Sequence, residues 1–294
     1  MNAPPILSVV IPSHRRTDRL AACLQSIQFH SPKEVDVIVI DDGSPNGGAS
    51  EVANRFAGVR CHRFNRSRGF CAAANQGLRM ATAPVVQLLN DDTEVTAGWA
   101  EAALAVFTNS QVAAVAPLIL RWPGDAIDSA GDHYDAGGFA QPRWRGNRIG
   151  SLKGNTSQSV LAASACGAFY RREVVMRIGG FAKSFGAYFE DVDLSCRLRR
   201  AGYSIEFVPA SRILHHGSSS YGPPRGRLLE RQSCNEERLF WRNQSGTPHE
   251  LIRHAAVVFA KAIRRWNEGR LVPWLCGRLR ALAMLPMDLT GRWS

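Results

Sequence analysis

The first 110 residues alternate short apolar runs with segments whose apolar residues recur at helical spacing, and this alternation restricts the fold most strongly. The predicted strands are Ile6–Ile11, Val35–Ile40, Val59–Phe64 and Val85–Leu89. The predicted helices are Thr17–Gln28, with Thr17 as its cap, Glu51–Phe56, Gly69–Ala81 and Trp99–Phe107. Continuous β-branched runs are typical of strands that are buried on both faces. The sequence therefore predicts an α/β fold, with a mostly parallel sheet between helices.

The regular alternation ends after Val112–Leu120, and Arg121–Asn155 is rich in Gly, Asp, Arg and Trp. A loop of this length is usually functional or mobile. Order returns with the predicted elements Ala165–Arg171, a helix from Glu190 to Ala201, and short strands at Tyr203–Val208 and Arg212–His215. We expect a catalytic domain over residues 1–245, with halves 1–110 and 111–245, and a helical region over 246–294.

Charge and cysteine content limit the partners and the compartment. The 36 Lys and Arg exceed the 25 Asp and Glu, giving a net charge of +11, which indicates an anionic partner or a solvated basic surface. The seven cysteines are scattered without a CxxC pair, which favours free thiols in a reducing compartment. The N-terminus has no signal-peptide pattern and no run of 18 apolar residues occurs. A cytoplasmic protein is expected.

Polar clusters follow three of the predicted strands where each strand ends. His14 and Arg15 follow the first, Asp42 the second, and Asp91 and Asp92 the fourth. In open α/β sheets ligands bind outside the carboxyl ends of the strands, so these side chains should share one crevice. Carboxylates placed there can hold a ribose or a divalent cation, Mg²⁺ or Mn²⁺. Ordinary turn and cap chemistry is the alternative for an isolated acidic pair.

Two further clusters lie in the second half. Glu190 and Asp191 open a predicted helix, where acids favour the helix dipole. The aromatic residues before them indicate a partly dry pocket, which suits a carboxylate acting as general base. His215 and His216 follow an apolar run and are either metal ligands or structural. Basic residues Arg197, Arg199 and Arg200 follow on the helix and either reach a diphosphate or form a solvated face.

Seven segments in order give the chain a family resemblance over about residues 6–220. They are VVIPSHRR, VIVIDDGS, NRSRGFCAAANQGL, LLNDDTEV, ACGAFYRREVVMRIGGF, FEDVDLSCRLRRAGY and HHGSSS. Together they resemble the inverting family 2 glycosyltransferases of GT-A fold. The motifs Gln-x-x-Arg-Trp and the membrane helices of the processive synthases do not occur, so the chain is similar to single-addition, rhamnosyltransferase-like enzymes.

The resemblance implies roles for particular residues. It places the nucleotide of a sugar-nucleotide donor, UDP- or dTDP-linked, beside Pro12, His14, Arg15, Asp42, Arg68, Gly69, Asn75 and Asp91. It implies Asp92 and His215 as ligands of Mn²⁺ or Mg²⁺, with His216 as the alternate. Many family members have Asn-Pro-Asp where this chain has Asn-Asp-Asp, so both acids stay candidates for direct ligation. Asp191, beside Glu190, falls on the catalytic base, and the acceptor would be a hydroxyl of a glycan or lipid-linked sugar in cell-surface polysaccharide synthesis.

Residues 246–294 carry 8 Lys and Arg against 3 Asp and Glu. Leu251–Trp266 and Leu271–Leu285 have the pattern of basic amphipathic helices, which can lie in a lipid headgroup region. Peripheral contact with the inner face of the cell membrane is one interpretation. Packing against the catalytic domain, or against a second subunit in a homo-oligomer, is the other.

Rival functions conflict with the motifs. A nicotinamide-dependent oxidoreductase would need GxGxxG after the first strand, where this chain has PSHRR. A nucleotidyltransferase making sugar nucleotides remains an alternative, although its Gly-rich loop is a poor match to PSHRR. A non-enzymatic nucleic-acid-binding protein is the other alternative; acids at the strand ends would hinder nucleic acid, which we do not expect as a partner.

Overall fold

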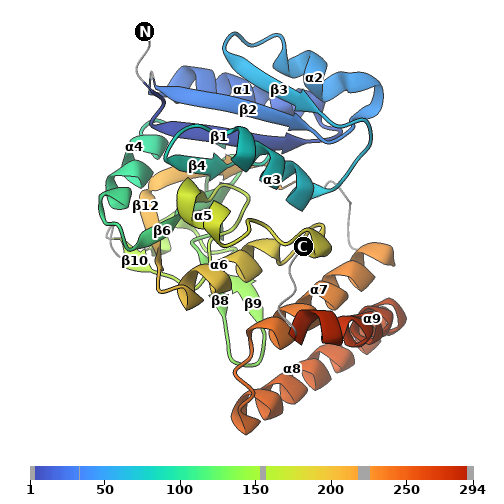
Figure 1. The fold of residues 1–294 in the computed structure, drawn as a ribbon. Helices are drawn as coiled ribbons and strands as arrows, with labels where there is room; N and C mark the ends of the chain where they lie inside the picture. Colours follow the sequence, from blue (N-terminus) through green and yellow to red (C-terminus); the bar gives the residue numbers. More distant parts are fainter. Residues whose placement is uncertain (1–3, 33, 153–156, 218–225, 290–294) are drawn as a thin grey trace.

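The structure is a computed structural model that describes residues 4–32, 34–152, 157–217 and 226–289 (Figure 1). Its centre is a ten-stranded sheet in the order β10-β12-β6-β11-β4-β1-β2-β3, with β5 beside β12 and β7 beside β6. The strands are β1 (Leu7–Ser13), β2 (Val35–Asp41), β3 (Val59–Arg63), β4 (Val85–Leu88), β5 (Thr93–Val95), β6 (Val112–Arg121), β7 (Ala126–Ser129), β10 (Gln158–Ser159), β11 (Phe169–Arg171) and β12 (Ser204–His215). A separate hairpin pairs β8 (Asp132–Tyr134) with β9 (Ala140–Pro142).

Six α-helices pack around this sheet. They are α1 (Thr17–His30), α2 (Gly48–Ala53), α3 (Phe70–Met80), α4 (Trp99–Leu104), α5 (Arg172–Arg177) and α6 (Glu190–Arg200). Short 3₁₀ turns lie at Pro45–Gly47, Ala105–Thr108, Ile149–Ser151 and Lys183–Phe185. The first predicted helix forms, but Thr17 is not its cap: Arg16 holds the N-cap position and makes no side-chain capping bond.

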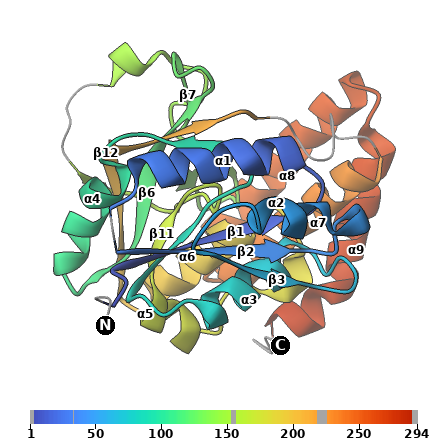
Figure 2. The same ribbon diagram turned by 90° about the horizontal axis from the view of Figure 1, so that it is seen from above.

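The strands β4, β1, β2 and β3 form the parallel half of the sheet. Alternate residues of β1 enter opposite cores, because successive side chains of a strand point to opposite faces. Val9 packs with α1, α2 and α4, whereas Val10 packs with α3 and α6. Figure 2 shows α1 and α2 on one side of these strands and α3 on the other. The predicted layering of helices on both faces is confirmed.

The other half of the sheet is mixed. Strand β11 lies antiparallel between β4 and β6, and β12 runs parallel to β6. The two strands expected at Tyr203–Val208 and Arg212–His215 are one strand, β12, whose register shifts between Val208 and Arg212. Pro209 lies in that interval; it has no N–H to donate, so pairing is interrupted while the chain direction is kept. The expected long loop Arg121–Asn155 contains β7 and the β8–β9 hairpin, although residues 153–156 lie outside the described part.

Three longer helices follow: α7 (Arg227–Asn243), α8 (Pro248–Asn267) and α9 (Leu271–Leu289). Figure 1 shows them together in orange and red, below and beside the sheet domain. Helix α8 begins with a capping box, in which Thr247 and Glu250 bond reciprocally, and Pro248 follows the cap. Helix α9 packs tightly on α7: a Cβ at Gly277 would lie 2.3 Å from the Glu230 carbonyl oxygen. The domain boundary at residue 245 stays a prediction.

Within the described ranges, none of the helices is both long enough and apolar enough to span a bilayer.

Candidate active site

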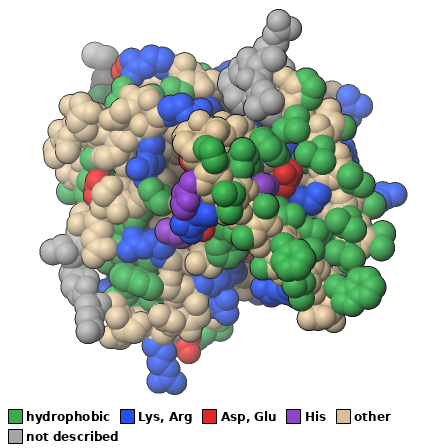
Figure 3. All heavy atoms as spheres, turned by 90° about the horizontal axis from the view of Figure 1, so that it is seen from below, with side chains coloured by type: hydrophobic (Ala, Val, Ile, Leu, Met, Phe, Trp, Pro, Cys, Tyr) green, Lys and Arg blue, Asp and Glu red, His purple; other side chains and the backbone are tan. Residues whose placement is uncertain are grey.

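A cavity of about 1400 Å³ opens at the carboxyl ends of β1, β2 and β4. It continues past the N-terminus of α6 to the inner sides of α7 and α9. Its lining includes the predicted residues Pro12, His14, Arg15, Asp42, Arg68, Gly69, Asp91, Asp92, Glu190, Asp191 and His215. Figure 3 shows histidine and basic side chains gathered near the centre of the face seen from below. The crevice expected from the strand ends therefore exists, and the residues predicted on distant segments meet in it.

One wall is built around Asp42. Its carboxylate accepts bonds from Ser67 Oγ at 2.6 Å, from the Arg68 N–H at 2.6 Å and from the Gly69 N–H at 3.0 Å. The Asp42 carbonyl oxygen lies 2.8 Å from His14 Nδ1. The carboxylate thus fixes the segment Ser67–Gly69 at the head of α3, beside the end of β1.

The neighbouring Asp41 shapes the turn below this wall. It is fully buried and accepts bonds from Ser44 and Ser50. Burial raises its pKa, but those hydrogen bonds outweigh burial and bring the pKa below the ordinary value. Gly43 lets the turn close, because a Cβ there would lie 2.5 Å from the Arg66 carbonyl carbon.

A second wall joins the end of β4 to the end of β12. His215 Nε2 lies 3.4 Å from Asp92 Oδ1, and His215 Nδ1 lies 2.8 Å from Asp128 Oδ2. Arg16 pairs with the other Asp92 oxygen. Burial raises the pKa of Asp92, but the contacts with His215 and Arg16 lower it below the ordinary value. The carboxylate is therefore charged at neutral pH.

Asp91 differs from its neighbour. It accepts a bond from Ser13 Oγ at 2.7 Å, and burial, with help from the Asp92 charge, raises its pKa to about 6. Both acids line the cavity, but only Asp92 faces the imidazole.

The donor set on this wall fits a divalent cation. Asp128 holds His215 Nδ1, so Nε2 is the ring nitrogen that faces Asp92, as in the carboxylate–histidine arrangement of metal sites. Among the described residues no group of three or more His, Cys, Asp or Glu could hold a metal by itself. Asp92 and His215 would thus supply two ligands, and substrate phosphate oxygens would complete the shell, a common arrangement for Mg²⁺ and Mn²⁺.

Three further acids of the cavity lining lie near one another, Asp132, Glu190 and Asp191. Asp191 Oδ2 accepts the Ala165 N–H at 3.0 Å, and its Oδ1 accepts the Val192 N–H at 2.9 Å. Burial raises the pKa of Asp191 despite these bonds. Burial, and then the Asp191 charge, raise the pKa of Asp132 to about 7. A carboxylate whose pKa lies closer to neutrality is a better general base.

Glu190 is buried beside Asp191, and burial, with the Asp191 charge, raises its pKa well above the ordinary value. Its Oε2 atom is buried and has no hydrogen-bond partner among the residues that the structure describes. A buried polar oxygen without a partner in a cavity wall is a place for a ligand hydroxyl or amide.

A strained turn presents these acids. Tyr188 and Phe189, just before α6, have φ of 73° and 67°, a conformation that is costly for bulky residues. Asn235 of α7 holds this turn: its Nδ2 donates to the carbonyl oxygens of Phe185 at 2.9 Å, Ala187 at 2.9 Å and Tyr188 at 3.0 Å. Helix α7 therefore fixes the backbone from which Asp191 projects.

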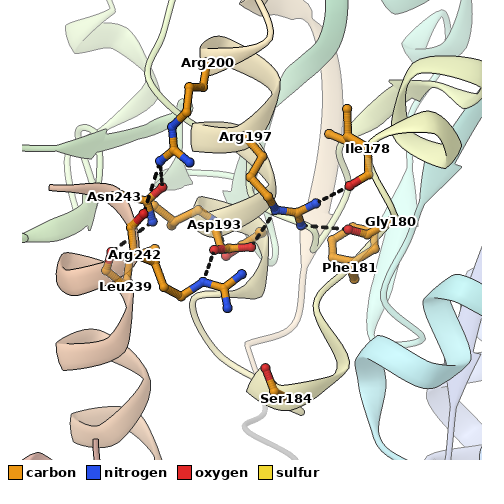
Figure 4. Close-up of polar contacts among 12 residues, drawn as sticks. Ile178, Gly180, Phe181, Ser184, Asp193, Arg197, Arg200, Leu239, Arg242 and Asn243 are labelled. Carbon is orange, nitrogen blue, oxygen red and sulfur yellow. Dashed lines mark hydrogen bonds and ion pairs between the residues drawn. The ribbon is translucent and has the colours of Figure 1, made fainter. Parts of the chain in front are cut away.

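A buried ionic cluster also joins α6 to α7 (Figure 4). Asp193 accepts bonds from Arg197 Nε at 2.9 Å and Arg242 Nε at 2.7 Å. Arg197 further donates to the carbonyl oxygens of Ile178 and Gly180. Arg197 therefore does not reach a diphosphate; its guanidinium is used inside the fold. Arg199 and Arg200 are exposed, as the solvated-face alternative expects, and Arg200 donates to Asn243; Arg197 fits neither alternative.

Two predicted site residues lie elsewhere. Asn75 was expected to contact the nucleotide, but its side-chain amide bonds both backbone groups of Phe181, at 2.7 and 2.8 Å. His216 was the alternate metal ligand, but its Nε2 lies 2.6 Å from Glu94 and its ring stacks on Trp122. Both side chains lie outside the cavity lining because their polar atoms are engaged within the fold.

Three residues of the site were missed by sequence reasoning: Asp128, Asp132 and Asn235. The first two belong to DAIDSAGD, an acidic stretch inside the segment expected to be a loop. Its three closely spaced aspartates were a usable signal. Asn235 lies in a helix full of charged residues and gives no comparable signal.

Comparison with known proteins places the chain among glycosyltransferases. It is 26% identical over 240 residues to an N-acetylglucosaminyl-diphospho-decaprenol L-rhamnosyltransferase of Mycobacterium tuberculosis, covering 74% of this chain and 78% of the relative. It is 26% identical to the O-antigen biosynthesis protein RfbC of Myxococcus xanthus, covering 74% of this chain and 18% of the relative. A Sinorhizobium fredii protein named y4gI, without an assigned function, is 27% identical, covering 82% of this chain and 28% of the relative. The chain thus spans under a third of two of these relatives.

Solved structures share the fold. The structure of GalNAc-T7 with UDP, GalNAc and Mn²⁺ superposes with a TM-score of 0.64 at 16% identity, covering 100% of this chain and 59% of that one. A mannosyltransferase from Pyrobaculum calidifontis with GDP-Man and Mn²⁺ gives 0.56 at 19% identity, covering 98% and 73%. The fold is that of the GT-A glycosyltransferases. The sequence model described as glycosyl transferase family 2 matches residues 8–179, more than half of the chain.

Proposed function

The chain belongs to glycosyl transferase family 2, and we propose that it moves a sugar, with inversion, from a nucleotide-diphosphate donor to an acceptor hydroxyl. One observation carries this proposal. A carboxylate–imidazole pair suited to a divalent cation, Asp92 with His215, and a carboxylate with a raised pKa, Asp191, line the same cavity. Donor activation and acceptor deprotonation need those two kinds of group in one space.

Asp191 would act on the acceptor. The acceptor hydroxyl loses its proton to Asp191 as its oxygen forms the bond to the anomeric carbon, and the bond from that carbon to the diphosphate oxygen breaks on the opposite face. The backbone N–H groups of Ala165 and Val192 hold the carboxylate in one orientation during this transfer. Glu190 Oε2, which is buried and has no partner within the described part of the chain, would bind a second polar group of the sugar or the acceptor.

The first wall would hold the nucleotide. Asp42, His14 and the segment Ser67–Gly69 form a bonded unit whose remaining carboxylate and imidazole surfaces suit a base and ribose. Exposed Arg15 lies at the cavity edge, where it can meet phosphate oxygens. The proposed nucleotide-contacting set is Pro12, His14, Arg15, Asp42, Arg68, Gly69 and Asp91.

Asp92 and His215 would hold Mn²⁺ or Mg²⁺, and the cation would neutralise the charge that develops on the departing diphosphate. Two solved structures of this fold were determined with Mn²⁺ together with UDP or a GDP-sugar, which supports Mn²⁺. The donor we propose is dTDP- or UDP-linked, and the GalNAc-T7 structure determined with UDP supports the second of these. For the acceptor we propose a glycan or lipid-linked sugar of cell-surface polysaccharide synthesis, in line with both named relatives.

A thermal-shift panel tests the donor half of the proposal. UDP, dTDP, GDP and CDP would each be added with Mn²⁺, with Mg²⁺ and with EDTA. A nucleotide at 100-fold over its Kd stabilises a fold by about 2.7 kcal/mol. We expect one nucleotide to raise the melting temperature in the presence of metal, and EDTA to remove the effect. A panel without any shift would contradict the donor site.

Asp191→Asn tests the catalytic half. The amide keeps the size of the side chain but cannot take a proton, so transfer should fall by roughly 10²–10⁴-fold. Nucleotide binding in the thermal-shift panel should stay near that of the wild type. Transfer within tenfold of wild type would remove Asp191 from the role of base.

A further inference from the structure

Helix α8 is oriented with its polar residues inward. His254 is buried, stacks on Phe240 with ring centroids 3.6 Å apart, and bonds the Gly137 carbonyl and Glu237. Lys261 pairs with Glu236 of α7 and lies over the Phe139 ring. An ordinary surface helix buries its apolar stripe, whereas α8 buries these polar side chains and leaves its apolar stripe exposed.

The outward stripe of α8 is apolar and well exposed. Ile252 is 70% exposed, Phe259 69%, Ile263 49% and Trp266 72%. Their spacing of seven, four and three residues puts them on one side of a helix. Such a row of large exposed side chains is uncommon on a monomeric soluble domain and marks an interaction surface.

Helix α9 continues this surface. Its Trp274 and Ala281 face inward and are buried, while Val272 at 71% and Leu279 at 65% face outward. An apolar hollow of about 350 Å³ lies between the two helices and is lined in part by Leu251, Val258, Leu275 and Leu282. Figure 3 shows hydrophobic side chains gathered on the side of the molecule where these helices lie. We call the outer stripes of α8 and α9, with this hollow, the α8–α9 face.

Arginines border the α8–α9 face. Arg253 and Arg264 lie along α8, with half or more of each side chain exposed, and they pair with Asp135 and Glu268. The sequence over 246–294 has 8 basic and 3 acidic residues. Two copies of a face with a basic border would repel each other in a symmetric pair, since the same charges would meet. An anionic lipid surface satisfies both the apolar stripes and the basic border.

We propose that the α8–α9 face lies on an anionic lipid bilayer, with its apolar side chains in the headgroup and acyl boundary. The same two helices turn their inner sides to the catalytic cavity, through Lys261, Arg265, Trp274, Arg280 and Met284. Contact with the bilayer therefore brings the far end of the cavity to the lipid surface. Given the proposed function, an acceptor carried on a lipid would enter the cavity from that end.

Vesicle co-sedimentation of the full chain tests this. The vesicles would be phosphatidylcholine alone or phosphatidylcholine mixed with phosphatidylglycerol, and the variant would be Phe259→Ser with Ile263→Ser. The matched control is Phe29→Ser on α1, where the side chain is 83% exposed. Since the double variant removes two large apolar side chains from the proposed lipid contact, it should bind mixed vesicles at least about tenfold more weakly. Wild type and Phe29→Ser should bind them alike, and more tightly than phosphatidylcholine alone.

Three results would overturn the proposal. The first is a wild type that fails to sediment with mixed vesicles, and the second is a double variant that binds them as well as wild type does. Alternatively, light scattering would show a wild-type dimer that ignores vesicles and dissociates in the double variant, which would make the face a subunit interface. Nucleotide-dependent thermal shifts of the same proteins separate the two proposals: they report the donor site, and they should be equal in wild type and double variant whatever the vesicles show.

Discussion

At the scale of single residues, Asp128 is the side chain that the sequence did not single out and that most directly supports the proposed metal site. It accepts from His215 Nδ1 at 2.8 Å and thereby decides which ring nitrogen faces Asp92. Burial raises the pKa of Asp128, but His215 and Arg145 lower it to about 2. Asp128 is thus a charged positioning residue and contacts the proposed cation only through the imidazole.

Asp128→Asn should weaken Mn²⁺ binding about 10–100-fold, the usual cost of losing a carboxylate behind a metal-binding histidine. Titration followed by electron paramagnetic resonance measures the free Mn²⁺ without relying on turnover. Asp125→Asn is the control, because this substitution removes the same charge from a nearby exposed residue that does not bond His215. Equal Mn²⁺ affinities for the two variants would contradict the role of Asp128.

Asn235→Ala removes the donor to three carbonyl oxygens in the turn before α6. The strained turn at Tyr188 and Phe189 should relax and displace Asp191, and a displacement of about 1 Å can lower a rate about 10²-fold. We expect kcat to fall while Kd for the donor nucleotide with Mn²⁺ is retained, since Asn235 bonds the turn before Asp191, whose residues are not among those proposed to contact the nucleotide. A parallel loss of nucleotide binding would mean that the whole site had moved.

At the scale of elements, α6 and α7 are joined through Asp193, which is 1% exposed and contacts Arg197 and Arg242. Asp193→Asn leaves two buried guanidinium groups without their carboxylate. Breaking a buried ion pair from one side costs about 3–5 kcal/mol, so the urea midpoint should fall strongly. Glu173→Gln, which breaks an exposed pair with Arg177, should change stability by less than about 0.5 kcal/mol. A small effect at Asp193 would show that water or other groups replace its contacts.

The elements themselves were largely predictable, because burial on both faces leaves continuous apolar runs and helices leave a 3.6-residue period. The predictions were wrong where tertiary contacts override a local sequence preference. Thr17 has the side chain of a cap, but the chain enters α1 with Arg16 in that position. In the sequence, Pro209 resembles the start of a turn. In the structure β12 pairs with β6 both before and after Pro209, so β12 is a single strand.

At the scale of the whole molecule, pH should act through the ionic network that holds α7, α8 and α9 together. Glu237 bonds His254 and pairs with Arg278. Burial raises its pKa, but those two partners lower it to about 2 from 4.5. A carboxyl with a lowered pKa stabilises the fold above its unfolded pKa and loses that contribution as the pH falls. The loss is about 3 kcal/mol between pH 4.5 and about pH 2.

Urea unfolding measured at several pH values across that window should show the wild type losing stability on acidification. Glu237→Gln should be less stable near neutrality and should have a shallower slope. Asp128, whose pKa is also about 2, would leave a residual slope in this variant. Identical slopes in the two proteins would show that Glu237 does not carry the acid sensitivity.

The sequence by itself determined the α/β class, the convergence of strand-end acids and the family. The first two follow from hydrophobic periods of two and 3.6 residues and from the rule that parallel strands end at one edge of a sheet. The third follows from seven short motifs in a fixed order. All three depend only on the order of residues along the chain. Only the tertiary structure decided which polar atoms are free to meet a ligand. Asn75 and His216 carry suitable groups, but contacts from Phe181 and Glu94 engage them. Asp128 and Asn235 gain their roles from partners 87 and about 50 residues away, and a local pattern does not encode distances of that kind.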